Sequence, residues 1–169
     1  MSLGLLLTMT EPPPAMEEEF NAWYDDEHLA ERLAIPGFRS AKRWVADVPA
    51  GRGKYLGTYE LDSPQVLNSH AYLQRFKNQT PWSKRCLSKC VLFRRWACEQ
   101  LSPGNGSLDS STRILLLGLG SEQPAASTSG MLFQDPNGKP PYAILIADQE
   151  KAAIPGFEFT LYRAYTRKS

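Results

Sequence analysis

One helical segment, residues 16–38 with the sequence MEEEFNAWYDDEHLAERLAIPGF, constrains the fold most, because it has both an apolar stripe and clear ends. At about 100° per residue, one side of this helix collects a set of apolar side chains: Met16, Phe20, Trp23, Ala30 and Ala34. Three glutamates open the helix, where negative charge complements the positive end of its dipole, and Pro36 with Gly37 ends it. The rest of the chain must therefore supply an apolar surface for this stripe.

Ionisable side chains interrupt the stripe in a way that packing alone does not explain. Glu27 lies inside the stripe, where a desolvated carboxylate would suit a general base, and an ion pair with Arg43 or Arg39 is an equal alternative. His28 is within helical reach of Asp25 and Tyr24, which could orient its imidazole, and a purely structural histidine is an equal alternative. We expect a kink near His28, or a last turn that is buried against another element.

Strand-like and helix-like segments alternate around this helix. Apolar and β-branched patterns predict strands at residues 3–9, 38–47, 54–61 and 91–98, and further helices at 63–77 and after Thr80. The order β-α-β-β-α-β predicts an α+β fold, a ferredoxin-like antiparallel sheet with both helices on one face. The other face would be bare, so we expect a homodimer through this open sheet face, or a cover formed by the tail.

The tail is predicted to hold three more strands, at residues 114–119, 142–147 and 157–165. The segment 153–157 (AIPGF) repeats 34–38 (AIPGF), which indicates a degenerate half-repeat, with chance similarity as an equal alternative. We therefore predict a domain at 1–103, a linker at 104–111, and a strand-rich half-repeat at 112–169 that packs on the first domain.

Composition excludes several classes of function. The net charge of +1 does not favour nucleic acid as a partner, and no apolar run approaches the length of a membrane span or forms a leader peptide, so we expect a cytoplasmic protein. The three cysteines lack zinc-site spacing, and we expect free thiols and no metal. Phosphate-binding glycine loops and nucleophile elbows are absent from the sequence.

Several motifs together resemble the EthD-like family of the dimeric α+β barrel superfamily. The resemblance covers roughly residues 3–103, departs from relatives that often carry proline where this chain has Ala30, and rests on these residues: Phe20-x-x-Trp23-Tyr24-x-x-Glu27-His28, Ile35-Pro36-Gly37-Phe38, Lys54-Tyr55-Leu56, Tyr59-Glu60, Thr80-Pro81-Trp82 and Arg94-Arg95. It implies paired ferredoxin-like sheets that form a dimeric or pseudo-dimeric barrel, with a pocket between sheet and helices. The resemblance implies no single reaction.

We interpret the chain as a small-molecule-binding protein and expect a cofactor-independent enzyme that moves protons on an aromatic or polyketide-like compound. The catalytic candidates are His28, Glu27 and Asp25. The candidates for ligand contact are Trp23, Tyr24, Arg43 and Trp82, although aromatic residues more often serve the core. Two alternatives stay open, namely a non-catalytic ligand-binding or accessory protein of a catabolic pathway, and a haem-binding barrel with His28 as axial ligand.

Overall fold

The computed structural model describes residues 2–125 and 129–167, which form eight antiparallel strands closed into one barrel. Around the barrel the strands follow the order β1-β3-β2-β8-β5-β7-β6-β4, and β4 pairs with β1 to close it. The strands are β1 (Gly4–Glu11), β2 (Phe38–Val45), β3 (Tyr55–Leu61), β4 (Leu92–Ser102), β5 (Ile114–Gly120), β6 (Met131–Gln134), β7 (Tyr142–Ala147) and β8 (Phe157–Ala164).

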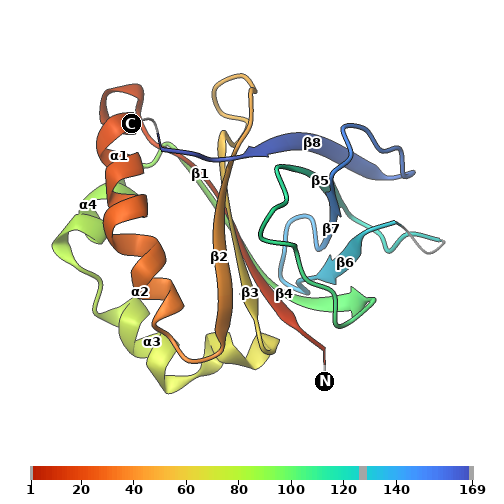
Figure 1. The fold of residues 1–169 in the computed structure, drawn as a ribbon, viewed down its shortest axis with the longest axis horizontal. Coiled ribbons are helices and arrows are strands. Elements are labelled where there is room, and N and C mark those ends of the chain that lie inside the picture. Colours follow the sequence, from red (N-terminus) through yellow and green to blue (C-terminus); the bar gives the residue numbers. More distant parts are fainter. Residues whose placement is uncertain (1, 126–128, 168–169) are drawn as a thin grey trace.

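The helices all lie on one side of the barrel, over the outer face of β1 to β4, as Figure 1 shows. The long helix after β1 has three parts, α1 (Glu17–Trp23), a π-helical turn η2 (Tyr24–His28) and α2 (Leu29–Leu33), and a 3₁₀ turn η1 (Pro14–Met16) precedes it. Between β3 and β4 lie a 3₁₀ turn η3 (Pro64–Asn68), α3 (His70–Lys77) and α4 (Pro81–Lys89). No helix in the described part of the chain has the length and apolar character needed to cross a bilayer.

Strand β1 is buried on both faces because the barrel core lies on one side of it and the helices on the other. Its odd-numbered residues Leu5, Leu7 and Met9 pack inside the barrel, together with Trp44 and Trp96. Leu6 points outward and packs with the helices in a second core. The barrel interior is thus filled by side chains, and the helix layer covers a separate apolar surface.

The repeated AIPGF segment adopts the same turn at both of its positions. Phe38 donates its backbone N–H to the carbonyl of Ile35 at 3.1 Å, and Phe157 donates to Ile154 at 3.0 Å. Gly37 and Gly156 have φ angles of 96° and 84°, which glycine adopts without steric cost. The two turns lead into β2 and β8, which pair with each other at Trp44 and Ala164. The half-repeat and the domain boundaries stay predictions.

The predicted fold class is wrong. The chain does not form a ferredoxin-like βαββαβ sheet with an open face, because strands of the same chain occupy both edges of its first four strands. At one edge β4 pairs with β6, with Gln100 opposite Phe133, and at the other β2 pairs with β8. A closed barrel has no free edges, and its inner face is covered by its own strands. The open face that motivated a homodimer is therefore absent, and dimerisation stays a prediction.

Candidate functional site

A cavity of about 780 Å³ lies between the helix layer and the outer face of the barrel. Its floor is formed by the outward-facing residues of β1, which are Leu6, Thr8 and Thr10, and by Tyr59 of β3. The strand periodicity explains this floor, because alternate residues of β1 share one face. The volume falls within the usual range for small-molecule sites, of about 300–1,000 Å³.

Aromatic and aliphatic side chains make up most of the cavity wall. They come from the long helix, from the helical segment between β3 and β4, and from the strands: Leu6, Tyr24, Tyr59, Leu67, Tyr72, Leu73, Phe76, Leu87 and Phe93. Leu73, Phe76 and Phe93 are about half exposed, although they are large and apolar. A cavity of this composition suits a flat, largely apolar molecule.

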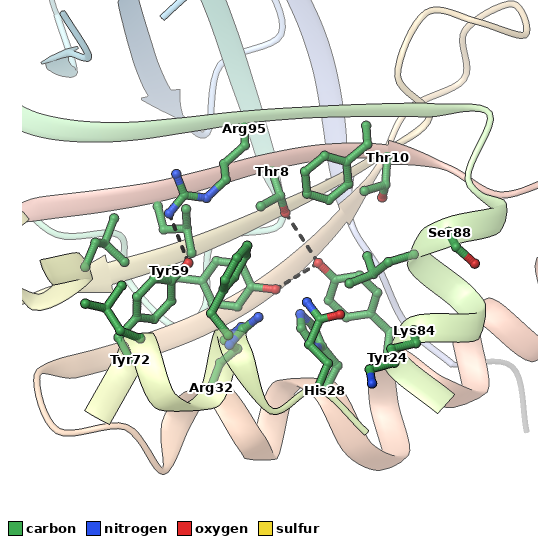
Figure 2. A pocket seen from close by; sticks show the side chains of 17 residues that line it. Thr8, Thr10, Tyr24, His28, Arg32, Tyr59, Tyr72, Lys84, Ser88 and Arg95 are labelled. Atoms are coloured by element: carbon green, nitrogen blue, oxygen red, sulfur yellow. Dashed lines mark hydrogen bonds between the residues drawn. The ribbon is translucent and has the colours of Figure 1, made fainter. Parts of the chain in front are cut away.

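A chain of hydroxyl groups crosses the cavity floor, as Figure 2 shows. The hydroxyl oxygens of Tyr24 and Tyr59 lie 2.8 Å apart, and the Tyr24 hydroxyl is 3.4 Å from Oγ1 of Thr8. Burial, and then the neighbouring Tyr24, raise the pKa of Tyr59 well above its ordinary value of 10.0. Tyr59 therefore keeps its proton at neutral pH, and the hydroxyl pair can donate a hydrogen bond to a ligand oxygen.

His28 lies in the same wall and is 7% exposed. Its ring stacks on the indole of Trp23, with centroids 4.5 Å apart, and meets the Tyr24 ring edge-on at 4.9 Å. No residue in the described part of the chain forms a hydrogen bond with its side chain. Burial, followed by the charges of Arg32 and Arg43, lowers the pKa of His28 well below 6.5. The imidazole is therefore neutral at physiological pH and can accept a proton.

The π-helical turn at residues 24–28 explains why His28 and Trp23 stack. In a regular α-helix, residues five positions apart point in different directions, whereas the i→i+5 spacing of a π-turn places them above one another. The same turn shifts the buried stripe by one position, so that His28 and Arg32 face the barrel. Turns of this kind occur frequently at functional sites.

Three cationic side chains line the cavity. Arg32 comes from α2 and is 8% exposed, whereas Lys84 of α4 and Arg95 of β4 are exposed. Arg95 donates a hydrogen bond to the Tyr72 hydroxyl at 2.9 Å, and the Arg32 guanidinium lies 5.6 Å from the Tyr72 ring centroid. None of the described residues that line the cavity is acidic. The cavity therefore has an apolar wall and a positive potential.

The structure places the predicted carboxylates away from the cavity lining. Glu27 accepts a hydrogen bond from Oγ1 of Thr80 at 2.8 Å, and Thr80 caps α4 by accepting from the backbone N–H of Ser83. Asp25 forms an ion pair with Arg43, with Nη1 and Oδ1 3.1 Å apart. Glu27 thus joins the long helix to the start of α4, and Asp25 joins the same helix to strand β2. Their catalytic roles stay predictions.

The predicted ligand contacts divide in the same way. Tyr24 lines the cavity, whereas Trp23 is fully buried behind His28 and donates its indole N–H to Oγ of Ser83 at 3.1 Å. Arg43 is enclosed by aromatic rings, with its guanidinium carbon 4.0 Å from the Tyr165 ring centroid and 4.4 Å from that of Tyr24. Trp82 is half-buried against the outer core. Of the seven predicted site residues, only His28 and Tyr24 border the cavity.

Sequence reasoning missed several residues that line the cavity. Thr8 and Thr10 carried a signal, because they are polar residues on the otherwise apolar face of a strand that also carries Leu6. Tyr59 and Arg95 belong to the motifs that suggested a family, although no site role was inferred for them. Arg32 carried no signal, because regular helical periodicity places it off the apolar stripe.

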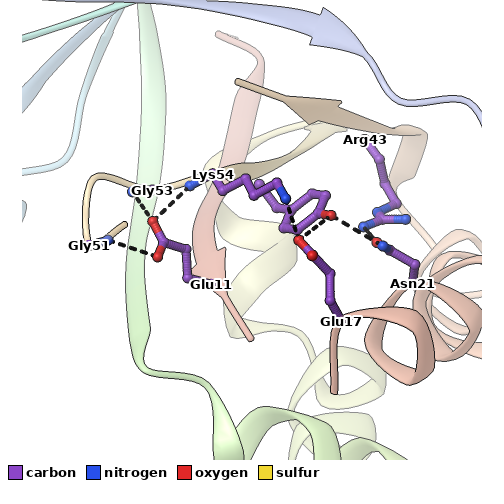
Figure 3. A network of polar contacts seen from close by, with 8 residues as sticks. Glu11, Glu17, Asn21, Arg43, Gly51, Gly53 and Lys54 are labelled. Atoms are coloured by element: carbon purple, nitrogen blue, oxygen red, sulfur yellow. Dashed lines mark hydrogen bonds and ion pairs between the residues drawn. The ribbon is translucent and has the colours of Figure 1, made fainter. Parts of the chain in front are cut away.

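A polar network fixes the start of the long helix to the barrel (Figure 3). The Glu11 carboxylate accepts hydrogen bonds from the backbone N–H groups of Gly51, Gly53 and Lys54 at 2.7 to 3.1 Å. Glu17 accepts hydrogen bonds from the Lys54 ammonium and, at 2.9 Å, from the Tyr55 hydroxyl. One turn later, Asn21 accepts a hydrogen bond from Arg43 at 2.6 Å. These contacts position α1, and therefore Tyr24 and His28, over β1 and β3.

The described residues contain no group of three His, Cys, Asp or Glu side chains that could hold a metal ion. Cys86, Cys90 and Cys98 are free. Burial raises the pKa values of Cys86 and Cys90 to about 11, so these thiols stay protonated at neutral pH and are poor nucleophiles.

Comparison with known proteins identifies a structural neighbour but no family. No family model matches the sequence, and no curated protein sequence matches it. A solved structure described as that of an anthrone oxidase-like protein is similar, with a TM-score of 0.57 and 12% sequence identity. The match covers 98% of this chain and 92% of that chain. At this level of identity the likeness shows a shared fold alone.

These findings correct the family inferred from the motifs. The assignment to the EthD-like family of the dimeric α+β barrel superfamily is wrong, because one chain closes an eight-stranded barrel and the structural match is to an anthrone oxidase-like protein. The motif residues that suggested this family include Trp23, Glu27 and Phe38, which pack or cap the helix layer. Aromatic and carboxylate residues at helical spacing can serve such packing in unrelated proteins, so the motif was not specific.

Proposed function

We propose that the protein binds a planar aromatic compound in the cavity beneath the helices and acts on it as a cofactor-independent enzyme, with His28 as general base. One observation carries this proposal. A buried, neutral histidine without a hydrogen-bond partner among the described residues lies in the wall of an aromatic cavity. A purely structural histidine is normally held by a hydrogen bond, because a buried polar group left unpaired destabilises the fold.

The substrate class follows from the shape and chemistry of the cavity. Its aromatic wall suits a fused-ring ligand, and the name of the structural neighbour leads us to take an anthrone, a tricyclic aromatic ketone, as the probe. The methylene group of an anthrone lies between two aromatic rings, and loss of one of its protons leaves a charge that is delocalised onto the ketone oxygen. The lowered pKa of His28 keeps its imidazole unprotonated and so available as a base, and stabilisation of the charge on the ketone oxygen offsets the reduced basicity.

The residues around His28 are arranged to assist this proton transfer. The imidazole accepts the methylene proton, and the electron pair of the broken C–H bond moves into the ring system toward the oxygen. The hydroxyl pair of Tyr24 and Tyr59 supplies a hydrogen-bond donor that stabilises the negative charge developing on that oxygen.

Proton transfer can be measured without following any later oxidation. We expect the wild-type protein to accelerate exchange of the anthrone methylene hydrogens with deuterium in D₂O, measured by NMR, above the rate in buffer. His28→Gln removes the base but keeps much of the side-chain size, and it should lower the exchange rate by about 10²-fold or more. His70→Gln is the matched control, because His70 is exposed on α3 and should leave the rate unchanged.

Other outcomes would support the remaining interpretations. If anthrone binds but the protein does not accelerate exchange, a non-catalytic binding or accessory role replaces the enzymatic proposal. If addition of haemin produces a Soret band that His28→Gln abolishes, the haem interpretation replaces it. If anthrone does not bind at all, the aromatic ligand class is wrong.

A further inference from the structure

Arg32 is a buried cation without an anionic partner. Its side chain rises from α2 into the cavity in Figure 2, and the residue is 8% exposed. Among the described residues, no side chain or backbone group forms an ion pair or a hydrogen bond with its guanidinium. The guanidinium lies over the aromatic ring of Tyr72, with its central carbon 5.6 Å from the ring centroid. A guanidinium has five N–H donors, so a face-on aromatic contact leaves most of them free.

The carboxylates nearest to Arg32 along the helix are occupied elsewhere. Glu31 approaches Arg75 at 4.0 Å, Glu27 accepts from Thr80, and Asp25 pairs with Arg43. Arg95 and Lys84, the other two cations of the cavity, are more exposed than Arg32 and are therefore better hydrated. The positive charge of Arg32 is the one that most requires a partner from the ligand.

Tyr72 links the two arginines of the cavity. Its hydroxyl accepts a hydrogen bond from Arg95 at 2.9 Å, and its ring lies against Arg32. In Figure 2 Arg32 approaches from the helix and Arg95 from strand β4, so the two guanidinium groups border the same end of the cavity. His28 lies toward the other end of the row formed by Tyr59 and Tyr24. A ligand that spans the cavity would therefore contact the imidazole of His28 at one end and the guanidinium groups of Arg32 and Arg95 at the other.

We propose that the ligand is an aromatic carboxylate, and that Arg32 binds its carboxylate group and so determines specificity. This inference rests on the proposed aromatic ligand and adds a charged group to it. The planar guanidinium fork matches the two oxygens of a carboxylate, and the cavity offers no like charge that would repel them. Arg32 is a binding residue in this proposal and takes no part in the proton transfer by His28.

Two probes that differ only in charge test the inference on the wild-type protein. Anthraquinone-2-carboxylate and anthraquinone-2-carboxamide share one ring system, and quenching of tryptophan fluorescence gives the Kd of each. We expect the carboxylate to bind about tenfold to 100-fold more tightly, the usual range for hydrogen bonds to a charged group. Arg32→Gln should reduce this preference to about twofold or less and leave the Kd of the carboxamide unchanged.

Two further variants separate charge recognition from folding. Arg32→Lys keeps the charge but loses the bidentate fork, so it should retain part of the preference. Arg75→Gln is the control, because Arg75 lies on the exposed side of α3 and should leave both Kd values unchanged. If Arg32→Gln does not fold, Arg32→Lys decides the question, because a partial loss of the preference in that variant assigns recognition to Arg32, and an unchanged preference overturns its role.

The outcomes distinguish this inference from the proposed function. Equal binding of carboxylate and carboxamide to the wild-type protein would overturn the role of Arg32 and leave the aromatic ligand class intact. A preference that persists in Arg32→Gln would also overturn it and would point to Arg95 or Lys84. Failure of both probes to bind, in a protein that also fails to bind anthrone, would overturn the aromatic ligand class as well.

Discussion

The imidazole of His28 stacks on the indole of Trp23, with ring centroids 4.5 Å apart and planes inclined by 29°. The two residues are five positions apart, and only the π-helical turn between them allows this contact. Trp23 itself is fixed by its hydrogen bond to Ser83 of α4. The stack therefore couples the orientation of the proposed base to the packing of two helices, and it keeps the imidazole out of bulk water.

We predict that His28 makes the stability of the protein depend on pH. Because the pKa of His28 in the folded protein is well below 6.5, the unfolded state binds more protons as the pH falls below 6.5. The free energy of unfolding should be highest above pH 6.5 and fall between pH 6.5 and the folded pKa, by up to about 1.4 kcal/mol per pH unit. Urea unfolding at pH 7.5 and pH 5.5 measures this difference.

The comparison of variants assigns this effect to His28. His28→Gln should lose the part of the pH dependence that His28 contributes, whereas His70→Gln should keep it. Around the imidazole lie the rings of Tyr24 and Tyr59, and Arg32 and Arg43 supply positive charge. No carboxylate pairs with the ring in the described residues, so no acidic neighbour reverses the sign. An unchanged pH dependence in His28→Gln would show that the imidazole is solvated in the folded state.

The π-turn also explains which part of the site sequence patterns could predict. Regular periodicity from Phe20 and Trp23 leads to Glu27, which was predicted to lie inside the apolar stripe, and then to Glu31 beside the stripe. The inserted residue moves the buried positions on by one, to His28 and Arg32. Amino-acid patterns contain no signal for such an insertion, because it is recognised from the side chains that end up buried. The prediction of His28 as a cavity residue rested on its possible partners Tyr24 and Asp25, of which Tyr24 is the one that it meets.

The fold was predictable in its parts but not in its closure. Alternating apolar residues located most of the strands, because each strand is at least half-buried whatever its partners are. Closure depends on the pairing of β2 with β8 and of β4 with β6, and the edge groups that pair are backbone atoms without a side-chain signature. The four residues of β6 were missed because a strand of that length is too short for its periodicity to be read.

Glu27 is predicted to be a structural residue. Glu27→Gln removes the charge that faces the start of α4 and weakens the hydrogen bond from Thr80, and it should destabilise the protein by about 1 kcal/mol. Methylene exchange in anthrone should continue at the wild-type rate. Glu18→Gln is the control, because Glu18 is exposed and the change should cost less than about 0.5 kcal/mol. Loss of exchange without a change in stability would restore Glu27 as a catalytic candidate.

Of the two arginines of β2, Arg43 should contribute more to the stability of the protein than Arg39. Its guanidinium is buried and donates to Asp25 and Asn21, so Arg43→Gln leaves a partly buried carboxylate without its partner and should cost on the order of 3 kcal/mol. Arg39→Gln tests the other arginine of the same strand. The pair of Arg39 with Asp62 is exposed, with a separation of 3.9 Å, and its loss should cost less than about 1 kcal/mol. Equal costs for the two variants, measured by urea unfolding, would contradict this assignment.

Gly57 should be required for the hydroxyl chain on the cavity floor. A Cβ atom at this position of β3 would lie 2.7 Å from Oγ1 of Thr8 and 2.9 Å from the hydroxyl oxygen of Tyr24, both too close for a carbon atom. Gly57→Ala should therefore displace Tyr24 and destabilise the protein by about 1–3 kcal/mol, the usual cost of overpacking. Because Tyr24 forms one wall of the cavity, the same change should weaken the binding of anthraquinone-2-carboxylate.

A double-mutant cycle tests whether the Tyr24 hydroxyl is the group in conflict. Tyr24→Phe removes the oxygen that the new methyl group would meet and loses the hydrogen bond to Tyr59, which contributes about 1 kcal/mol. If the conflict is with this hydroxyl, the double variant Gly57→Ala/Tyr24→Phe should be less destabilised than the sum of the two single variants, by more than about 0.5 kcal/mol. Strict additivity would mean that Thr8 or the ring of Tyr59 receives the methyl group instead, since Cε2 of Tyr59 lies 3.1 Å from the same position.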